Sequence, residues 1–505
     1  MTRPQAVLPP AGSEGWIQTV VLKALNHSVV YGLSVGLLPL TNLLLLPIYT
    51  RHLSPEAFGV LALLMVTSGV LSFLYDLGMI NALFRRYFDH TPEAADDRRT
   101  VLSTAWMFMT VHAAVWAVVL LIAAHWLPPV GAQGHITGVV RLMVLSTLVN
   151  ACADVPAAVL RLRERVRTFA LVCLLRSGVL IAVTYTLVAV RGRGLAGVFE
   201  SSLVAGGSAL IPLVALTARE YAARVSWAEF TAMVKFGLPF FPVLFFTWII
   251  DFSDRYFLGI LSTLDEVGVY TVGYKIGQIV LLAVKAFMVA WIPLMFSIAR
   301  KPQAPEAFAK VFRYYLLGLS VLGLSIVLWR GELVGFVAPA SYHRAADIVP
   351  LVVAAYLCYG LYSFMLSGLL VTRDVWVQPA TLATAAGLNA VLNWWWIPSF
   401  GMWGAAWATI VSYSFAAVAT WAASQRRYPI PVEGRRLCLM LGGALVFAVV
   451  ATWYHLPGAG KILLLGLYGG LLCAAHVVSP GEVRTLTGML TRFRSVPSDA
   501  ALAAD

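Results

Sequence analysis

Charged side chains are the scarcest feature of this 505-residue sequence. Asp, Glu, Lys and Arg make up 12% of the chain, whereas soluble proteins of ordinary composition carry about 25%. Apolar residue types form 60%, and the mean hydropathy is +0.81. No long polar block separates the hydrophobic runs. This composition excludes a soluble enzyme and predicts an integral membrane protein.

Cysteines and metal-binding patterns are also sparse. The five cysteines lie inside apolar runs, so neither a disulfide framework nor a metal site is predicted. No histidine pair has the spacing of a zinc motif, and no Walker-type phosphate loop is present. The net charge of +12 comes from short basic clusters between apolar runs, which is a membrane-topology signal rather than a nucleic-acid signal. We therefore expect no cofactor, no metal and no nucleic-acid partner.

Hydrophobic runs long enough to cross a bilayer recur along the whole chain. A spanning helix needs about 20 apolar residues, and these runs lack the alternation of barrel strands. The predicted fold class is therefore an all-α integral membrane protein. We predict fourteen spans, at residues 28–50, 58–80, 100–127, 138–160, 168–190, 196–217, 235–258, 268–290, 314–330, 345–370, 376–397, 401–423, 437–455 and 461–478.

The basic residues predict the orientation of these spans. Of the 36 Lys and Arg residues, 24 lie on one side of the predicted membrane, six on the other and six within the spans. Positive charge is retained on the cytoplasmic side. We therefore expect both termini in the cytoplasm, which an even number of spans satisfies.

A short internal repeat accompanies the second and eighth spans. Residues 53–60 and 261–270 each place Leu-Ser before an acidic residue and a Gly-Val pair, about 209 positions apart. Six helices separate the copies, so the halves have the same orientation, and such parallel repeats predict two lobes around a central cavity. We assign the chain to a cytoplasmic N-terminal segment (1–27), an N-lobe of helices 1–6 (28–217), a C-lobe of helices 7–12 (218–423), two additional helices (424–478) and a cytoplasmic tail (479–505).

Four motifs resemble a known family. They read LPIYTRHLSPEAFG at 46–59, LGM at 77–79 with RY at 86–87, DRYFLG at 254–259 with EVGVY at 266–270, and NAVLN at 389–393 with IPSFGMWGAAWAT at 397–409. In these segments the chain is similar to the polysaccharide biosynthesis and oligosaccharide flippase family. The superfamily also contains multidrug and toxic-compound extruders, known as MATE proteins, and lipid II flippases.

The resemblance implies a MATE-like bundle in the bacterial inner membrane. It implies a transporter, not an enzyme, that moves a lipid-linked oligosaccharide to the outer leaflet or exports a related polysaccharide by alternating access. The implied partners are the lipid-linked glycan and membrane lipids, with a coupling ion, a glycan polymerase and glycosyltransferases left open. A cation-coupled multidrug exporter and, third, a membrane glycosyltransferase or polymerase remain as alternatives.

Charged side chains within the spans are the candidate site. Each costs about 2.5–3.5 kcal/mol at the centre of a membrane helix unless it meets a partner or water. Helical spacing places polar side chains on common faces of the first, second, seventh and eighth spans, and the candidate substrate-binding residues are Asn42, Asp76, Arg86, Arg255, Tyr274, Lys275, Gln278 and Lys285. The cations are expected to hold the pyrophosphate of an isoprenoid-linked sugar. The alternative is that they neutralise carboxylates between helices.

Two pairings follow from the sequence. Asp251 precedes Arg255 by four residues, the favourable order for an ion pair on one helix. The repeat offset places Asp76 and Lys285 at corresponding positions, so we expect them to face each other across the two lobes.

The basic bias makes a testable prediction of topology. In a variant without native cysteines, a cysteine at Ser399 is expected to react with an impermeant reagent added from outside. A cysteine at Ser424 should be protected until the membrane is permeabilised. Protection of Ser399 together with outside labelling at Ser424 would reverse the orientation.

Overall fold

The computed structural model describes residues 40–90, 95–126, 136–374, 376–454 and 457–475. All regular secondary structure in these ranges is helical. The predicted N-terminal segment, residues 28–39 of the first predicted span, and the C-terminal tail lie outside the described residues. So do Tyr31 and Ser34, which the sequence places on the polar face of that span.

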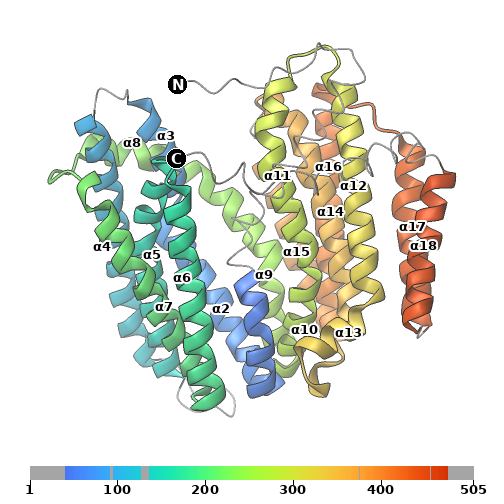
Figure 1. The fold of residues 1–505 in the computed structure, drawn as a ribbon, viewed down its shortest axis with the longest axis horizontal. Coiled ribbons are helices and arrows are strands. Elements are labelled where there is room, and N and C mark those ends of the chain that lie inside the picture. Colours follow the sequence, from blue (N-terminus) through green and yellow to red (C-terminus); the bar gives the residue numbers. More distant parts are fainter. Residues whose placement is uncertain (1–39, 91–94, 127–135, 375, 455–456, 476–505) are drawn as a thin grey trace, which may run out of the picture.

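The helices form two groups that stand side by side (Figure 1). The N-terminal group contains a helix at 40–52, followed by α2 (Pro55–Asp76), α3 (Met79–Asp89), α4 (Ala95–Ala123), α5 (Thr137–Leu162), α6 (Val166–Thr184) and α7 (Gly194–Thr217). The C-terminal group contains α9 (Phe241–Leu261), α10 (Leu264–Gly277), α11 (Ile279–Ile298), α12 (Ala304–Leu328), α13 (Arg330–Val337), α14 (Ala345–Val371), α15 (Val377–Phe400) and α16 (Met402–Arg427). We call these groups the N-lobe and the C-lobe.

Three helices lie outside this division. The last two, α17 (Gly434–Trp453) and α18 (Gly458–Ala474), pack on the outer side of the C-lobe against α12 (Figure 1). The short α8 (Trp227–Gly237) leads into α9 but packs against α3 and α4 of the N-lobe. The sequence predicted that residues 218–423 form the C-lobe, whereas α8 packs against the N-lobe.

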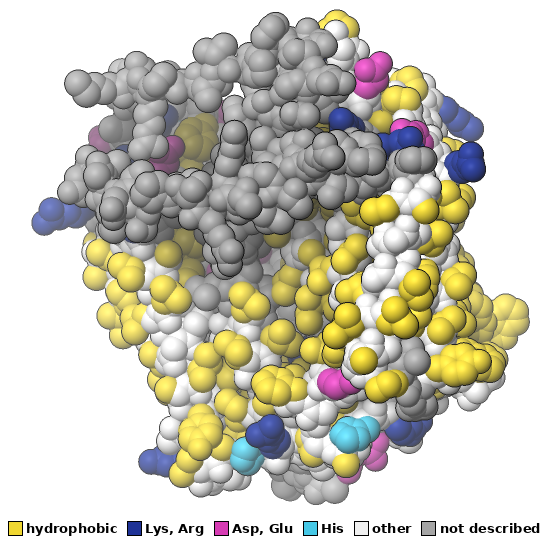
Figure 2. Space-filling view, turned by 45° about the vertical axis from the view of Figure 1, so that its right-hand side comes forward, with side chains coloured by type: hydrophobic (Ala, Val, Ile, Leu, Met, Phe, Trp, Pro, Cys, Tyr) yellow, Lys and Arg dark blue, Asp and Glu magenta, His cyan; other side chains and the backbone are white. Residues whose placement is uncertain are grey.

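The helices confirm a polytopic membrane protein. Ten helices among the described residues are long and apolar enough to cross a membrane, or eleven if α8 and α9, bent by 45°, form one span. The three other predicted spans correspond to the helix at 40–52, to α15 and to the shorter α18. Hydrophobic side chains cover the middle of the visible surface, and basic side chains lie toward its upper and lower edges (Figure 2). This distribution is that of a protein surrounded by lipid.

The internal repeat is visible in how α2 and α10 begin. Ser54 caps α2 by accepting a hydrogen bond from the amide of Ala57, and Thr263 caps α10 by accepting one from the amide of Glu266. Both capping pairs are related by the same offset of 209 positions. The side-chain oxygens satisfy amide groups that have no partner within the helix. The repeated sequence therefore encodes the same helix start in both lobes.

The two repeat copies meet each other directly. A Cβ atom on Gly59 would lie 2.0 Å from the carbonyl oxygen of Leu264, and one on Gly268 would lie 2.1 Å from that of Pro55. These contacts are reciprocal, so the crossing of α2 and α10 has the approximate two-fold symmetry of the repeat. Only glycine permits backbones to approach this closely. The crossing joins the lobes at the end predicted to face outside, at the lower edge of Figure 1.

Two hydrogen bonds reinforce the same end. The Thr50 hydroxyl donates to the carbonyl oxygen of Val337 at 2.5 Å. The Tyr342 hydroxyl donates to the carbonyl oxygen of Leu53 at 2.9 Å. Both bonds connect the start of the N-lobe to the segment after α12, so the lobes are tightly joined at the predicted outer end.

The burial of Ser424 changes one detail of the topology experiment. Its side chain is 1% exposed and would not react with a labelling reagent on either side. Arg426 is exposed two residues further on and is the better position for the cytoplasmic cysteine.

The glycine crossing predicts how the conformational equilibrium responds to one methyl group. Gly59→Ala and Gly268→Ala are each expected to push the outer ends apart, because the new Cβ has no room in this arrangement. Spin labels at exposed positions His52 and Ser341 should then report a population with a longer distance. Gly138→Ala is the matched control, since a Cβ there meets nothing within 4 Å. An unchanged distance distribution in both crossing variants would show that the contact does not hold the outer end closed.

Candidate functional site

Two adjoining cavities lie where the lobes face each other. The smaller has a volume of about 310 Å³ and is lined by α2, α9 and α10. The larger has a volume of about 570 Å³ and is lined by the helix at 40–52 and by α9 to α12. Phe252, Lys275 and Gln278 line both. The cavities are therefore parts of one region between the lobes.

A break in the eighth span places the polar residues of this region. The span is divided at Gln278, between the end of α10 at Gly277 and the start of α11 at Ile279. Gly277 allows α14 to pack closely here, because a Cβ atom would lie 2.6 Å from a methyl carbon of Val352. Lys275, Gln278 and Lys285 all line the larger cavity, and Asn42 lines it from the N-lobe. Four of the eight predicted site residues are thus brought together.

The two lysines of this region carry charge without a direct partner in the described part of the chain. No hydrogen bond or ion pair joins either ammonium group to a described residue. The charge of Lys285 acts on the Asp251 carboxylate through space. Both lysines line the larger cavity, where two such cations form an electropositive site, available to an anion of suitable size.

Arg255 also lines the smaller cavity, but its guanidinium group has partners inside the C-lobe. It donates to the carboxylate of Asp254 at 2.9 Å and to the backbone carbonyl of Asp251 at 2.7 Å. Its charge lies 4.1 Å from the centre of the Tyr274 ring, within cation–π range. The predicted ion pair with the Asp251 carboxylate is wrong, because the neighbouring Asp254 takes that place. Arg255 holds the C-lobe together from within.

Tyrosines complete this buried network. The Asp251 carboxylate accepts a hydrogen bond from Tyr413 at 2.6 Å, and the Asp254 carboxylate accepts one from Tyr270 at 2.5 Å. Tyr274 is 1% exposed and packs among these rings, so it supports Arg255 instead of lining either cavity. Sequence reasoning missed Tyr270 and Tyr413. Tyr413 lies on a distant helix, but Tyr270 lies four residues before Tyr274 and was detectable by helical spacing.

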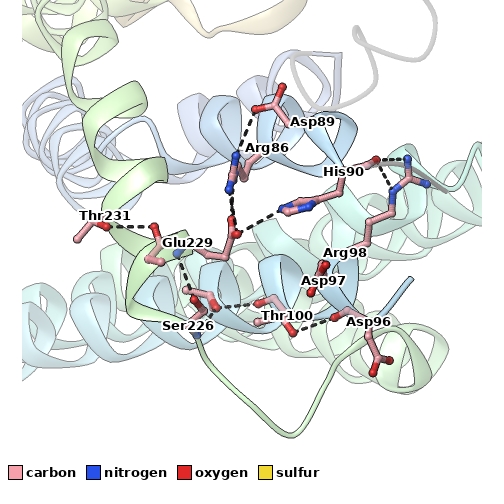
Figure 3. A network of polar contacts seen from close by, with 12 residues as sticks. Arg86, Asp89, His90, Asp96, Asp97, Arg98, Thr100, Ser226, Glu229 and Thr231 are labelled. Atoms are coloured by element: carbon pink, nitrogen blue, oxygen red, sulfur yellow. Dashed lines mark hydrogen bonds and ion pairs between the residues drawn. The ribbon is translucent and has the colours of Figure 1, made fainter. Parts of the chain in front are cut away.

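Arg86 belongs to a different network, at the contact of α3 with α8 (Figure 3). Its guanidinium group forms two hydrogen bonds to the carboxylate of Glu229, at 2.6 and 3.0 Å. His90 approaches the same carboxylate at 3.3 Å, and Asp89 lies 3.8 Å from Arg86. A paired guanidinium and carboxylate of this geometry fasten two helices together. Arg86 is therefore not among the residues that line the cavities with the lysines.

Asp76 is likewise held locally. The second span breaks at Leu77 and Gly78, which have left-handed φ angles of 47° and 76°. After this turn the Asp76 carboxylate accepts a hydrogen bond from the amide of Ile80 at 3.0 Å, at the start of α3. The expected pairing of Asp76 with Lys285 is not formed, because no ion pair joins the two side chains in the described part of the chain and Asp76 does not line the larger cavity. The prediction assumed an unbroken helix.

The described architecture is that of a polytopic helical membrane protein of two repeat-related lobes, with a site between them. Residues 48–326 match the family model described as "Polysaccharide biosynthesis protein". This match covers more than half of the sequence, and the chain belongs to that family. No curated protein matches.

Solved structures share the fold. A multidrug resistance MATE family transporter of the MOP superfamily, in an inward-facing conformation, aligns with TM-score 0.68 at 14% identity, over 81% of this chain and 98% of its own. The lipid II flippase MurJ, in an inward closed conformation, aligns with TM-score 0.67 at 12% identity, over 87% and 97%. A MOP superfamily transporter from Pyrococcus furiosus, whose title reports a binding pocket of reverse polarity, aligns with TM-score 0.59 at 13% identity, over 83% and 98%. The MATE-like fold predicted from the sequence is thereby confirmed.

The contrast between paired and unpaired cations predicts that removing Arg255 destabilises the protein far more than removing Lys275. Arg255→Ala is expected to destabilise the protein by about 3–5 kcal/mol, because it leaves the Asp254 carboxylate buried and unpaired. Lys275→Ala removes a cation without a partner among the described residues, and should change stability by less than about 0.5 kcal/mol. Melting temperatures in detergent distinguish the two. A normal melting temperature for Arg255→Ala together with a lowered one for Lys275→Ala would contradict this prediction. It would show that Lys275 is the residue that stabilises the fold.

Proposed function

We propose that this protein flips a lipid-linked oligosaccharide, a polyprenyl-pyrophosphate glycan, or exports a related polysaccharide, across the bacterial inner membrane by alternating access. It acts as a transporter without catalysing a chemical reaction, and both of its termini lie in the cytoplasm. The observation that carries the proposal is the pair Lys275 and Lys285 at cavities between the lobes. The family's description in polysaccharide biosynthesis supports the substrate class.

The chemistry of the two lysines suits a pyrophosphate. An ammonium group is a compact point charge with three donors, which binds phosphate oxygens in several geometries. Lys275 and Lys285 lie on either side of the break at Gln278, and both line the larger cavity. A moving headgroup can therefore pass from one charge to the other. Gln278 and Asn42, which line the larger cavity with both lysines, supply neutral hydrogen-bonding groups.

The closed end of the molecule fits one stage of alternating access. The crossing at Gly59 and Gly268 joins the lobes at the predicted outer end. Release of a glycan outside would require this contact to separate, together with the hydrogen bonds of Thr50 and Tyr342 at the same end.

The polarity of the site favours an anionic substrate over a cationic drug. The carboxylates of the buried network accept hydrogen bonds from tyrosines or from Arg255, whereas the lysines at the cavities have no direct partner among the described residues. A cationic drug would need an available carboxylate at this position. The multidrug alternative thus predicts the opposite arrangement of available charge.

Substitution of the lysines tests the proposal. Lys285→Ala and Lys275→Ala are each expected to reduce flipping at least about tenfold, the effect of losing about 1.4 kcal/mol of interaction. Lys285→Arg should keep part of the activity, because the charge remains with altered geometry. The measurement is surface glycan in a complementation assay, with the amount of membrane protein quantified alongside.

A structural role for Lys285 has its own signature. Because its charge acts on Asp251, the double variant Asp251→Asn/Lys285→Ala is the relevant control. Recovery of transport in this double variant would assign Lys285 to charge balance and leave Lys275 as the substrate-binding lysine. Normal glycan export by both single alanine variants, or export of a cationic dye that depends on neither lysine, would refute the glycan proposal.

A further inference from the structure

One face of α9 carries an unbroken row of aromatic side chains. Phe241, Phe245, Trp248, Phe252 and Tyr256 are spaced by three or four residues, so they follow one stripe of the helix. The rings of Phe241 and Phe245 are inclined by 11° with centres 5.9 Å apart, and those of Phe245 and Trp248 by 12° at 6.4 Å. Trp248 then approaches Phe252 and Tyr256 at 6.4 and 6.2 Å. We call these five residues the aromatic row.

The aromatic row faces away from the core of its own lobe. The other side of α9 carries Ile250, Asp251 and Asp254, which are buried in the C-lobe. Trp248 and Phe252 line the smaller cavity opposite α2. Toward the predicted outer end, the Tyr256 hydroxyl lies 2.6 Å from the hydroxyl of Thr67 on α2. The row therefore lies along the junction of the lobes instead of in the packed interior.

Length and accessibility distinguish this row from ordinary packing. From Phe241 to Tyr256 the row extends about 22 Å along the helix. The hydrocarbon core of a membrane is about 30 Å thick, so the row covers most of that thickness. Phe245 is 38% exposed. The indole nitrogen of Trp248 is buried against Gly69 of α2 without a hydrogen-bond partner among the described residues. A buried donor of this kind gains a partner when a polar ligand enters.

We propose that the aromatic row is the binding surface for the sugar rings of the transported glycan. Aromatic faces carry negative charge density, and the C–H bonds on one face of a pyranose ring carry partial positive charge. Such stacking requires no defined pattern of hydroxyl groups, in the same way that aromatic platforms accept every base of single-stranded nucleic acid. The Trp248 indole would donate to a sugar hydroxyl once the lobes separate. This inference rests on the proposed function, because it assigns the glycan part of the same substrate.

The row and the lysines divide the substrate between them. Phe252 lines both cavities together with Lys275, so sugar rings on the row would lie next to a pyrophosphate held by that lysine. Removing the aromatic faces should therefore weaken the glycosylated lipid specifically. Binding of the bare lipid should depend on the lysines instead.

Binding of two lipids to purified protein in nanodiscs tests the assignment. The probes are polyprenyl pyrophosphate without sugar and the same lipid carrying a tetrasaccharide of hexoses and N-acetylhexosamines. The variant Phe241→Leu/Phe245→Leu/Trp248→Leu leaves Phe252 in place beside Lys275 and keeps apolar character and helix propensity. We expect it to bind the bare lipid as the wild type does and the glycosylated lipid at least about tenfold more weakly, an affinity loss of about 1.4 kcal/mol. Trp394→Leu/Trp395→Leu removes exposed aromatic rings from α15 and should change neither affinity.

The outcomes separate this inference from the proposed function. Equal binding of the two lipids by the wild type, or an unchanged preference in the triple variant, would overturn the role of the row and leave the lysine site intact. Failure of the wild type to bind either lipid would overturn both. Loss of bare-lipid binding in the triple variant would show that the row supports the structure of the lysine site. The row would then not be a separate surface for sugar rings.

Discussion

A charge inside the hydrocarbon layer must meet an opposite charge, a hydrogen-bonding group or water, and this constraint sorts the interior of the protein. Arg255 satisfies it through Asp254 and the ring of Tyr274. Lys275 and Lys285 meet it at cavities, without a direct partner among the described residues. The first solution fixes helices to each other, whereas the second leaves charge for a ligand. The same physical rule therefore distinguishes the charged residue that stabilises the C-lobe from the two that remain available to a ligand.

The backbone crossing of α2 and α10 supplies the geometry for that site. Gly59 and Gly268 occupy equivalent positions in the repeat, and each makes room for the helix of the other. A contact made by two copies of one motif is symmetric, so neither lobe encloses the other. The lobes consequently meet along a symmetric contact, with the two cavities on the predicted cytoplasmic side of the crossing. The capped helix starts that define the repeat in the sequence therefore lie at the crossing that has its approximate two-fold symmetry.

The sequence predicted the spans and the cavity residues of the eighth helix because periodicity survives there despite the break at Gln278. It did not predict the neighbourhoods of Arg86 and Arg255. Helical spacing assumes a continuous helix, and the left-handed turn at Gly78 carries Arg86 toward Glu229, a residue 143 positions away. For Arg255, helical spacing favoured Asp251, four residues before it. Arg255 instead pairs with the adjacent Asp254, while the Asp251 carboxylate accepts a hydrogen bond from Tyr413, on a helix remote in sequence.

The two faces of α9 connect these observations. Its charged face is fixed in the C-lobe by hydrogen bonds to α10 and α16, so the helix moves with that lobe. Its aromatic face and the lysines of α10 and α11 then belong to the same rigid unit, while the N-lobe contributes the opposing wall through α2 and the helix at 40–52. In the proposed alternating-access cycle, a substrate bound to the lysines and the aromatic row would keep its contacts as the lobes tilt about the glycine crossing. Tilting would change the side of the membrane to which the site is open and leave the site itself unchanged.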